Sequence, residues 1–440
     1  MNRLLSNTSW IMFGQIIQMA ISFFVGILST RYLGPSNYGV ITYVASYVAF
    51  FSSIGLMGMD TVVVSRLVKD PDHDGEEVAS AVALRTAVST ICMAAMIFVV
   101  AIVEKGNQMY LLVALLSGFE LIFKAFGTIG FWYQYKLMSR RTAIADTIAF
   151  LIASAYRIYL LASHASLYGF AFYTSLIYLL EGIFYVTMFR KDCVHSIKAD
   201  RTLCRELFHA CIPYLVSGVM ISLYTQVDRL MIKWITGSAE EVGYYSCAYV
   251  ISNLVAFIPN SLALSARPVL LDLKSRQAPE YETRVTQVMA AMMWFSMLYS
   301  IFITITARWV VNLLYGEAYL EAVSPLRILV WVSLVENLTR IRDLWLIGAD
   351  QSRFVTWFSV SGTLGNMILN AILIPVHGIS GAAAATVITQ LAVIIILPAC
   401  FRETRQFAID AVRALLLRQV HVRDLLKEVA DGFRGRRKQA

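Results

Sequence analysis

Long apolar stretches with few charges recur along the whole chain. Four of them carry no charged residue over more than twenty positions: 9–30, 242–266, 285–307 and 379–401. A helix of about 20 apolar residues crosses the roughly 30 Å hydrocarbon core of a bilayer. The pattern therefore predicts an all-α membrane protein with twelve transmembrane helices, near residues 9–30, 38–60, 83–103, 109–132, 143–163, 167–189, 207–236, 242–266, 285–307, 324–347, 354–375 and 379–401.

The composition supports this prediction. Hydrophobic residues make up 58% of the 440 residues and charged residues only 15%, and the mean hydropathy is +0.64. A water-soluble chain of this composition would have too few polar groups to cover its surface. The six cysteines are scattered, with no spacing typical of a metal site, so we expect free thiols and neither a metal nor another cofactor.

Basic residues gather in alternate connections between the predicted helices. Of the 37 Lys and Arg residues, 29 fall in the N-terminal tail, the even-numbered connections and the C-terminal tail from Arg402. Positively charged loops stay on the cytoplasmic side of a membrane. The distribution predicts that both termini are cytoplasmic. The net charge of +8 is then a signal of topology, and we expect no nucleic acid partner.

A long, polar and basic connection at 190–206 divides the predicted helices into six and six. It predicts an N-terminal lobe at 1–195, a C-terminal lobe at 196–401 and a basic cytoplasmic tail at 402–440. The glycine-flanked segment 34–39 has a faint echo at 237–243, which joins the equivalent helices of the second half. Because six is even, such a repeat would be parallel, with a pseudo-twofold axis along the membrane normal.

Several segments resemble a known family. They are 31–39, the Asp228-Arg229 pair with 242–245 downstream, 324–327, and 365–370 with 374–386. Together they are similar to the polysaccharide-biosynthesis and O-antigen flippases of the multidrug/oligosaccharidyl-lipid/polysaccharide exporter superfamily. The resemblance implies two lobes that rock in alternating access around a cationic cavity. It also implies a cargo of oligosaccharide linked to undecaprenyl pyrophosphate, carried from the cytoplasmic to the periplasmic leaflet of a bacterial inner membrane.

Four cations lie inside predicted spans, where an ionisable side chain costs roughly 2.5–3.5 kcal/mol at the helix centre. Guanidinium groups bind phosphate oxygens bidentately, so these residues are candidates for binding the cargo. Glu120 lies four residues before one of them and can pair with it along one helix face, which leaves a structural role open there. The candidate substrate-binding residues are Lys124, Arg157, Arg229 and Arg327.

Three carboxylates are candidates for binding a coupling ion, either H⁺ or Na⁺. They are Asp60 near the end of the second span, Asp228 in the seventh and Glu336 in the tenth. Plain charge pairing inside the helix bundle is the alternative for each of them.

An aromatic run, Phe-Trp-Tyr-Gln-Tyr at 131–135, falls at the end of the fourth span. Aromatic side chains of this kind form belts at membrane–water interfaces. The alternative is a platform on which sugar rings stack.

The sequence favours a transporter over an enzyme. The outer connections are all short, no cluster of catalytic groups is present and there is no Walker A motif. A cation-coupled multidrug efflux transporter of the same superfamily is one alternative, and a non-transporting scaffold for glycan-assembly enzymes is another. Expected partners are membrane lipids and the lipid-linked oligosaccharide, with a polysaccharide polymerase or glycosyltransferases as candidate protein partners.

Overall fold

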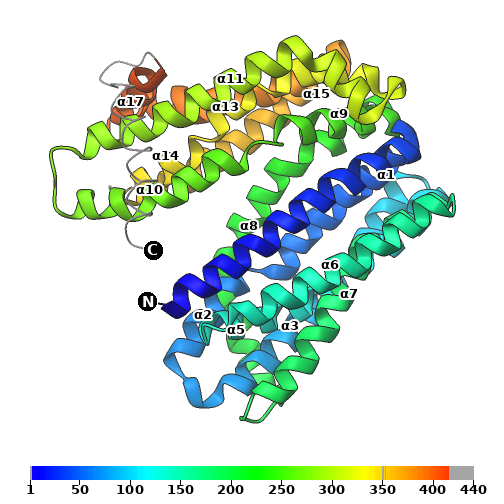
Figure 1. Ribbon diagram of the computed structural model, residues 1–440, viewed down its shortest axis with the longest axis vertical. Helices are drawn as coiled ribbons and strands as arrows, with labels where there is room; N and C mark the ends of the chain where they lie inside the picture. The colour runs from blue at the N-terminus through cyan, green and yellow to red at the C-terminus, as the bar shows by residue number, and fades with distance from the viewer. Residues whose placement is uncertain (1, 349–350, 352, 416–440) are drawn as a thin grey trace. The chain divides into compact units, whose positions relative to one another are not determined.

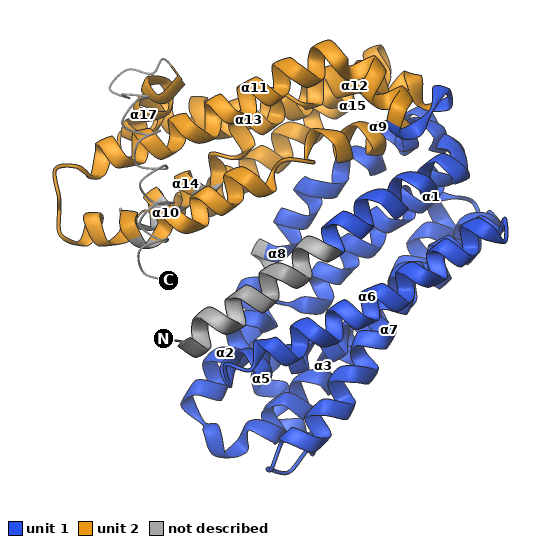
Figure 2. Ribbon diagram, in the orientation of Figure 1, with its two compact units in different colours: residues 1–243, 314–318 blue, residues 244–313, 319–440 orange. Residues whose placement is uncertain are grey.

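The computed structural model describes residues 2–348, 351 and 353–415 (Figure 1). All the regular secondary structure in this part of the chain is helical, which confirms the all-α prediction. The chain forms two compact units (Figure 2). Unit 1 holds the residues up to Gly243 together with Leu314–Ala318, and unit 2 holds Tyr244–Leu313 and the residues from Tyr319 on.

Unit 1 is a bundle of long helices around the apolar core that their buried faces form. Its elements are α1 (Asn2–Leu56), α2 (Met59–Lys69), η1 (Pro71–His73), α3 (Asp74–Val103), α4 (Gln108–Phe123), η2 (Lys124–Thr128), α5 (Ile129–Tyr135), α6 (Ser139–Ala162), α7 (Leu167–Asp192) and α8 (Arg201–Thr236).

Unit 2 begins within the next helix and is built in the same way. Its elements are α9 (Ala239–Ser252), α10 (Phe257–Ser275), α11 (Tyr281–Tyr315), η3 (Glu317–Ala322), α12 (Val323–Leu329), α13 (Val332–Glu336), α14 (Thr339–Gly348), α15 (Arg353–Leu391), the π-helix η4 (Ala392–Ile396), α16 (Leu397–Cys400) and α17 (Arg405–Leu415).

Two of the helices are broken at a glycine in a backbone conformation that other residues rarely adopt. Gly34 in α1 has φ 70° and is followed by Pro35. Gly378 in α15 has φ 56°, three residues after Pro375. Glycine reaches positive φ without the steric cost of a Cβ atom, so each break lies between two of the predicted spans.

The glycine-flanked echo segments lie against each other inside unit 1. A Cβ atom on Gly39 would come within 1.7 Å of the Ala239 carbonyl oxygen, and one on Gly243 within 2.1 Å of the Pro35 carbonyl oxygen. A backbone carbonyl approaches a helix this closely only where that helix has a glycine without a Cβ atom. The faint repeat in the sequence therefore marks a packing contact between α1 and the start of α9.

Eight helices in the described residues are long and apolar enough to cross a membrane, or ten when each of two bent helix pairs is one span. The chain is thus a multi-pass membrane protein. α1 and the run Arg353–Cys400 each cover two of the predicted spans. The count of twelve and the cytoplasmic termini stay predictions.

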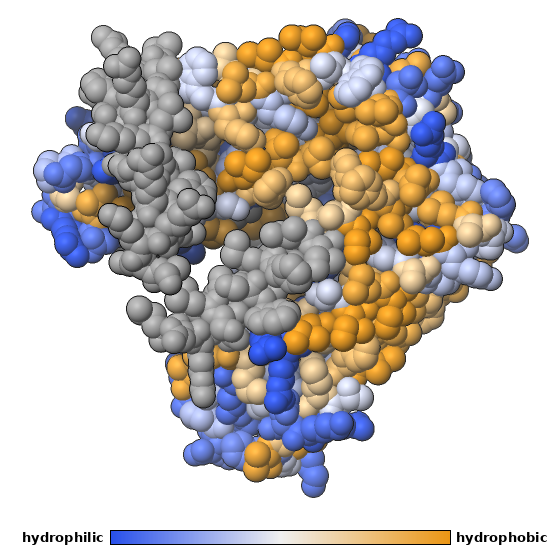
Figure 3. Space-filling model, in the orientation of Figure 1, coloured by the Kyte–Doolittle hydropathy of each residue, from blue (hydrophilic) through white to orange (hydrophobic). Residues whose placement is uncertain are grey.

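The outer surface fits this environment. Large apolar side chains cover much of the face shown in Figure 3, and exposed examples come from both units, including Ile91, Phe98, Ile305 and Trp357. A soluble monomer rarely exposes apolar patches of such extent.

The connection between α7 and α8 is held tightly against α3. The Ser80 hydroxyl accepts a hydrogen bond from the Asp200 amide at 2.9 Å, and a Cβ on Gly75 would meet the Ser196 carbonyl oxygen at 2.6 Å. The buried Asp74 carboxylate accepts from the Trp132 indole at 2.9 Å and contacts His195 at 2.8 Å. Its ion pair with Lys136 at 2.9 Å raises the pKa of that lysine.

These contacts place α8 in unit 1, and the compact units divide at Gly243. The predicted lobe boundary at 195/196 describes a different division and stays a prediction. Residues 402–415 of the predicted tail pack into unit 2: Phe407 and Ala411 of α17 belong to its buried core. The remainder of that tail, 416–440, lies outside the described residues.

Candidate functional site

The polar side chains of the unit 1 interior come from α3, α4, α6 and α7. The predicted pair on α4 is formed: the Lys124 ammonium donates to Glu120 Oε1 at 2.5 Å. The same ammonium lies 4.5 Å from the centre of the Tyr178 ring. The charge of Lys124 is therefore already compensated by the protein, as expected for an i, i+4 pair on one helix face.

Arg157 on α6 has no such compensation. Its guanidinium lies over the Tyr173 ring of α7 at 4.7 Å, and its Nε is buried with no hydrogen-bond partner among the described residues. No carboxylate in that part of the chain lies within ion-pair distance of it. A cation–π contact stabilises a desolvated guanidinium by about 2 kcal/mol, which leaves part of the burial cost unmet.

Arg85 on α3 is a second guanidinium of this kind, and the sequence analysis missed it. Only 7% of the residue is exposed, and its Nη1 donates to the Thr128 hydroxyl at 3.2 Å. No ion pair to it is present within the described residues. Arg85 is the third residue of the predicted span 83–103, next to the basic connection that precedes it. The apolar residues that precede it, from Val78 on, were the signal that the helix already runs through this position.

Two carboxylates of the same interior also lack an ion pair in the described part of the chain. The Asp146 carboxylate on α6 accepts a hydrogen bond from the Tyr185 hydroxyl at 2.7 Å. Glu181 on α7 is half-buried. Asp146 and Arg157 share a face of α6, as the eleven-residue spacing predicts, about 16 Å apart along the axis.

The two neighbouring charges on α8 lie in different surroundings. Asp228 is 8% exposed. Arg229 is half-buried, and its Nη1 donates to the Gln226 side chain one turn earlier at 3.0 Å. Successive helical residues diverge by about 100°, so the two side chains do not face the same neighbours.

The other predicted site residues are spread over both units. Asp60 is exposed on α2 of unit 1. In unit 2, Arg327 is exposed on α12 and Glu336 is half-buried at the end of α13. The structure thus brings the candidates of unit 1 together only in part.

A polar cavity of about 660 Å³ opens beside the end of α3 in unit 1. Trp234, half exposed, lines it together with Glu104 and Lys233. The Trp234 indole donates to the hydroxyls of Tyr43 and Tyr47 at 3.1 and 3.0 Å, so its ring is fixed. Lys233 and Glu104 form an ion pair at 3.7 Å, and Lys105 also lines the cavity, so the lining has one more cation than carboxylates.

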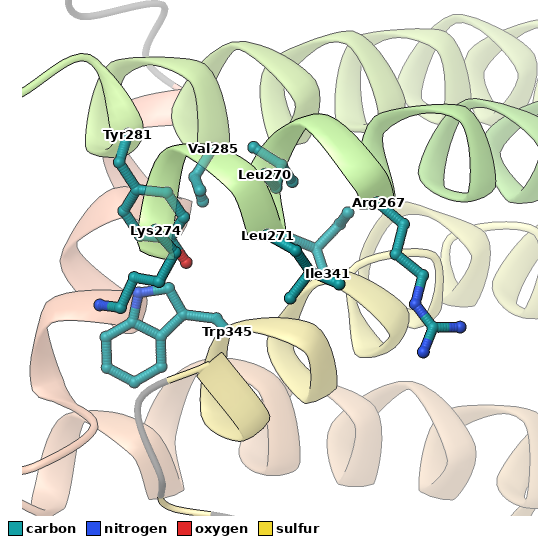
Figure 4. Close-up of a pocket in the computed structure, with 8 residues that line it drawn as sticks. All are labelled: Arg267, Leu270, Leu271, Lys274, Tyr281, Val285, Ile341 and Trp345. Carbon is teal, nitrogen blue, oxygen red and sulfur yellow. The ribbon is translucent and has the colours of Figure 1, made fainter. Parts of the chain in front are cut away.

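Unit 2 contains a small crevice between α10, α11 and α14. Figure 4 shows Lys274, Tyr281 and Trp345 at one end of it and Arg267 at the other. Its volume is about 10 Å³, which is room for about one water molecule. This crevice is too small for a ligand.

The described residues contain no group of three or more His, Cys, Asp or Glu side chains that would hold a metal ion. The six cysteines are free. We therefore assign no metal-ligating residue.

Comparison with solved structures identifies the fold. A multidrug resistance MATE family transporter of the MOP superfamily, in an inward-facing conformation, superposes with a TM-score of 0.66 at 15% identity, covering 92% of this chain and 96% of that one. The lipid II flippase MurJ gives 0.68 at 11% identity, over 92% and 90%. A MOP superfamily transporter from Pyrococcus furiosus gives 0.54 at 14% identity, over 94% and 95%. The fold is that of MOP-type transporters.

Sequence comparison gives the family. A membrane protein of Methanocaldococcus jannaschii, described as uncharacterized, is 21% identical over 268 residues, which are 58% of this chain. The chain spans about half the length of that relative. The family described as polysaccharide biosynthesis protein matches residues 4–274, more than half of the chain. The chain belongs to the polysaccharide biosynthesis protein family.

Proposed function

We propose that this protein is a flippase that moves an oligosaccharide linked to undecaprenyl pyrophosphate from the cytoplasmic to the periplasmic leaflet of a bacterial inner membrane. The family and the MOP-type fold support a transporter that serves polysaccharide assembly. The cargo pairs a double anion with a polar glycan and a long apolar chain. A flippase must shield the first two from hydrocarbon while the third stays in the lipid.

The observation that carries this proposal is the guanidinium of Arg157, which has no ion pair within the described residues and contacts the Tyr173 ring at 4.7 Å. Ionisable groups inside membrane proteins are expensive and mark substrate pathways when no protein partner neutralises them. An unpaired arginine in a helix bundle attracts an anion, and its planar fork matches two phosphate oxygens. Arg85 adds a second buried guanidinium without an ion pair in the described residues. Each of these guanidinium groups carries a positive charge that would attract a phosphate oxygen.

The same residues weigh against the efflux alternative. A transporter of cationic drugs is expected to present carboxylates that lack inward arginines, whereas unit 1 buries Arg85 almost completely. Glu181, which has no ion pair within the described residues, agrees better with a second role, which is to bind a coupling ion. A scaffold without transport would have no use for an unpaired cation inside its bundle.

We also propose that transport is coupled to H⁺ or Na⁺, and Asp60, Asp228 and Glu336 are the candidate residues that bind this ion. Glu181 is a further candidate, because it is half-buried and has no ion pair within the described residues. A titrating carboxylate loses this role when it becomes an amide of the same shape. Asp228→Asn should therefore change how transport responds to pH and sodium. A response identical to that of the wild type would make this residue structural.

Protein partners are also proposed. The product of the reaction is a lipid-linked glycan at the periplasmic face, so a polymerase is expected to take it up. Glycosyltransferases that build the glycan are expected on the cytoplasmic side. The tail, rich in arginine at 402–440, is a candidate contact for such partners and for anionic lipid, at roughly 1 kcal/mol per basic residue near the surface.

Translocation in reconstituted vesicles tests the proposal. Wild type, Arg157→Ala, Arg157→Lys, Arg229→Ala and a control, Arg140→Ala at the exposed start of the same helix α6, would be compared at equal protein density. We expect transfer of a labelled lipid-linked oligosaccharide by wild type and by the control. Both Arg157→Ala and Arg229→Ala should lose at least tenfold, and Lys at 157 should restore only part of it. Full transfer by both alanine variants would refute the assignment.

A further inference from the structure

A second polar cavity of unit 1 lies between the start of α6 and the segment formed by η2 and α5. Its volume is about 450 Å³, within the range of small-molecule sites. Two helical stripes face it, each with the i, i+3, i+4, i+7 spacing of one helix face. One stripe is 127, 130, 131 and 134, and the other is 139, 142, 143 and 146, with Thr147 beside it. Gln18 of α1 and Tyr185 of α7 complete the lining.

Glycine makes the room on the first stripe. A Cβ atom placed on Gly127 meets no other atom within 4 Å, so its position is open space. A Cβ on Gly130 would approach the Tyr185 ring at 3.3 Å. Larger residues at these two positions would fill the space between α5, α6 and α7. The cavity is thus a consequence of the sequence and not of loose packing.

The aromatic run at 131–135 is divided between the core and this cavity. Trp132 and Tyr133 are buried, and their polar atoms donate to carboxylates of Asp74 and Asp192 at 2.9 and 2.8 Å. Phe131 and Gln134 are the two members that line the cavity. Two residues of the run therefore pack in the core, and two others face the cavity.

The chemistry of the lining is that of a site for hydroxyl groups. The described lining residues supply two side-chain amides, Gln18 and Gln134, three hydroxyls, Ser139, Thr142 and Thr147, and the Asp146 carboxylate. Tyr185 donates to one oxygen of Asp146 at 2.7 Å, which orients the other for a further donor. No Lys or Arg is among the described residues that line the cavity. Such a lining suits neither a phosphate nor an apolar tail.

We propose that this cavity binds a neutral sugar ring of the cargo, through hydrogen bonds from its hydroxyls to Asp146, Gln18 and Gln134 and through contact with the Phe131 ring. The inference rests on the proposed function and adds a second contact for the same cargo. Arg157 lies about 16 Å further along α6, so the sugar site and the guanidinium that would bind phosphate are distinct. An aromatic face beside convergent amide and carboxylate groups is suited to a ring that has both polar edges and an apolar face.

Ligand-observed saturation transfer NMR on the full chain in nanodiscs, prepared without sugar-based detergent, tests the site without any need for transport. The probes are methyl glycosides of neutral hexoses, of N-acetylhexosamines and of uronic acids at equal concentration. Gly127→Leu fills the cavity at a position with room for the new side chain. Gly365→Leu is the matched control, because that glycine of α15 in unit 2 also has nothing within 4 Å of its Cβ position. Asp146→Asn keeps the shape and removes the charge.

We expect neutral glycosides to give signals with wild type and with Gly365→Leu, a loss of at least fivefold with Gly127→Leu, and a reduction with Asp146→Asn. The thermal stability of Gly127→Leu is measured in parallel to confirm that it is folded.

Equal signals from Gly127→Leu and the control, no signal from any neutral glycoside with wild type, or a preference for uronic acids would each overturn the sugar site. The vesicle assay with Arg157 variants is unaffected by these results. If no sugar binds in this cavity, the sugar site is refuted and the flippase proposal is not. If sugar binds but the vesicle assay shows no transport, only the flippase proposal is refuted.

Discussion

The interiors of the two units handle charge differently. In unit 2, the buried charged side chains within the described residues are Arg342 and Asp410, and each has an ion partner, Asp343 at 2.7 Å and Arg413 at 3.3 Å. In unit 1, the guanidinium of Arg85 is buried with no ion partner among the described residues, and the buried Nε of Arg157 has no hydrogen-bond partner among them. A protein retains an uncompensated charge in its interior only for a reason other than stability. This contrast is the reason why we propose that unit 1 binds the anion.

The largest expected effect tests whether unit 2 depends on apolar packing. Phe407 of α17 is 1% exposed and lies 6.1 Å from the Trp345 ring centre. Phe407→Ala should lower the free energy of unfolding by about 3–5 kcal/mol, because a large aromatic side chain leaves a cavity. Ile409→Ala on the exposed side of the same helix is the control and should change it by less than about 1 kcal/mol. Denaturation in detergent measures both. Equal stabilities would place α17 outside the folded unit.

The paired arginine of unit 2 should behave as a structural residue. Arg342→Met removes hydrogen bonds to Asp343 at 2.7 and 3.0 Å. We expect the free energy of unfolding to fall by about 2 kcal/mol. This is less than for a fully buried pair, because the Asp343 side chain is 32% exposed and water can hydrate it once Arg342 is gone. The double variant Arg342→Met/Asp343→Asn should recover part of this loss. If the variant lost transport but kept its stability, Arg342 would have a role in transport and not in folding.

The unpaired arginine of unit 1 should show the opposite behaviour. Arg157→Met replaces a desolvated cation by an apolar side chain, so the folded state should keep its stability or gain about 1 kcal/mol. Transport should nevertheless be lost. Thermal unfolding and vesicle translocation are measured on the same preparation. A variant that unfolds more easily than the wild type would mean that Arg157 stabilises the bundle, and the contrast between the units would disappear.

The smallest effect concerns pH. Burial and the nearby Glu282 carboxylate raise the pKa of Asp410 above its usual value. A raised pKa in the folded state means that this group contributes most stability below its unfolded pKa, about 4, and that the contribution is lost as the pH rises through the folded value. The melting temperature of the wild type should therefore fall slightly more than that of Asp410→Asn between pH 4 and pH 7. If the melting temperatures of the two proteins change equally with pH, the ion pair with Arg413 offsets the raised pKa of Asp410.

Much of the fold could be predicted from the sequence, because lipid imposes a simple rule on helix length. The breaks at Gly34 and Gly378 were also predictable, since Pro35 follows the first glycine directly, Pro375 lies three residues before the second, and each lies near the end of an apolar run. Pro213 and Pro259 are the sequence signals for bends inside the seventh and eighth predicted spans, and the structure has a bend of 51° within 201–236 and one of 47° within 239–275. In both places the apolar run continues across the bend, so hydropathy gives no signal of a change in direction.

The candidate site was predictable only where partners are close in sequence. Glu120 and Lys124 are one helical turn apart, so their pair could be expected. Arg157 depends on which residues of α7 lie beside it, and helix packing decides that. Arg85 was missed for a related reason, because a charge at the edge of an apolar run is read as the end of a span. The cavity lies between one face of α5 and one face of α6. These two faces meet only because the chain turns at 136–138, and the spacing of residues within each helix does not predict this.

Binding of a polyprenyl pyrophosphate tests directly whether Arg157 binds the phosphate groups of the cargo. Wild type and Arg157→Ala in nanodiscs would be titrated with undecaprenyl pyrophosphate and with undecaprenol, which has the same chain and no phosphate. We expect wild type to bind the pyrophosphate at least tenfold more tightly than the alcohol, and Arg157→Ala to lose most of this difference while its affinity for the alcohol is unchanged. Equal affinities of the wild type for the two lipids, or a preference that Arg157→Ala retains in full, would contradict this expectation.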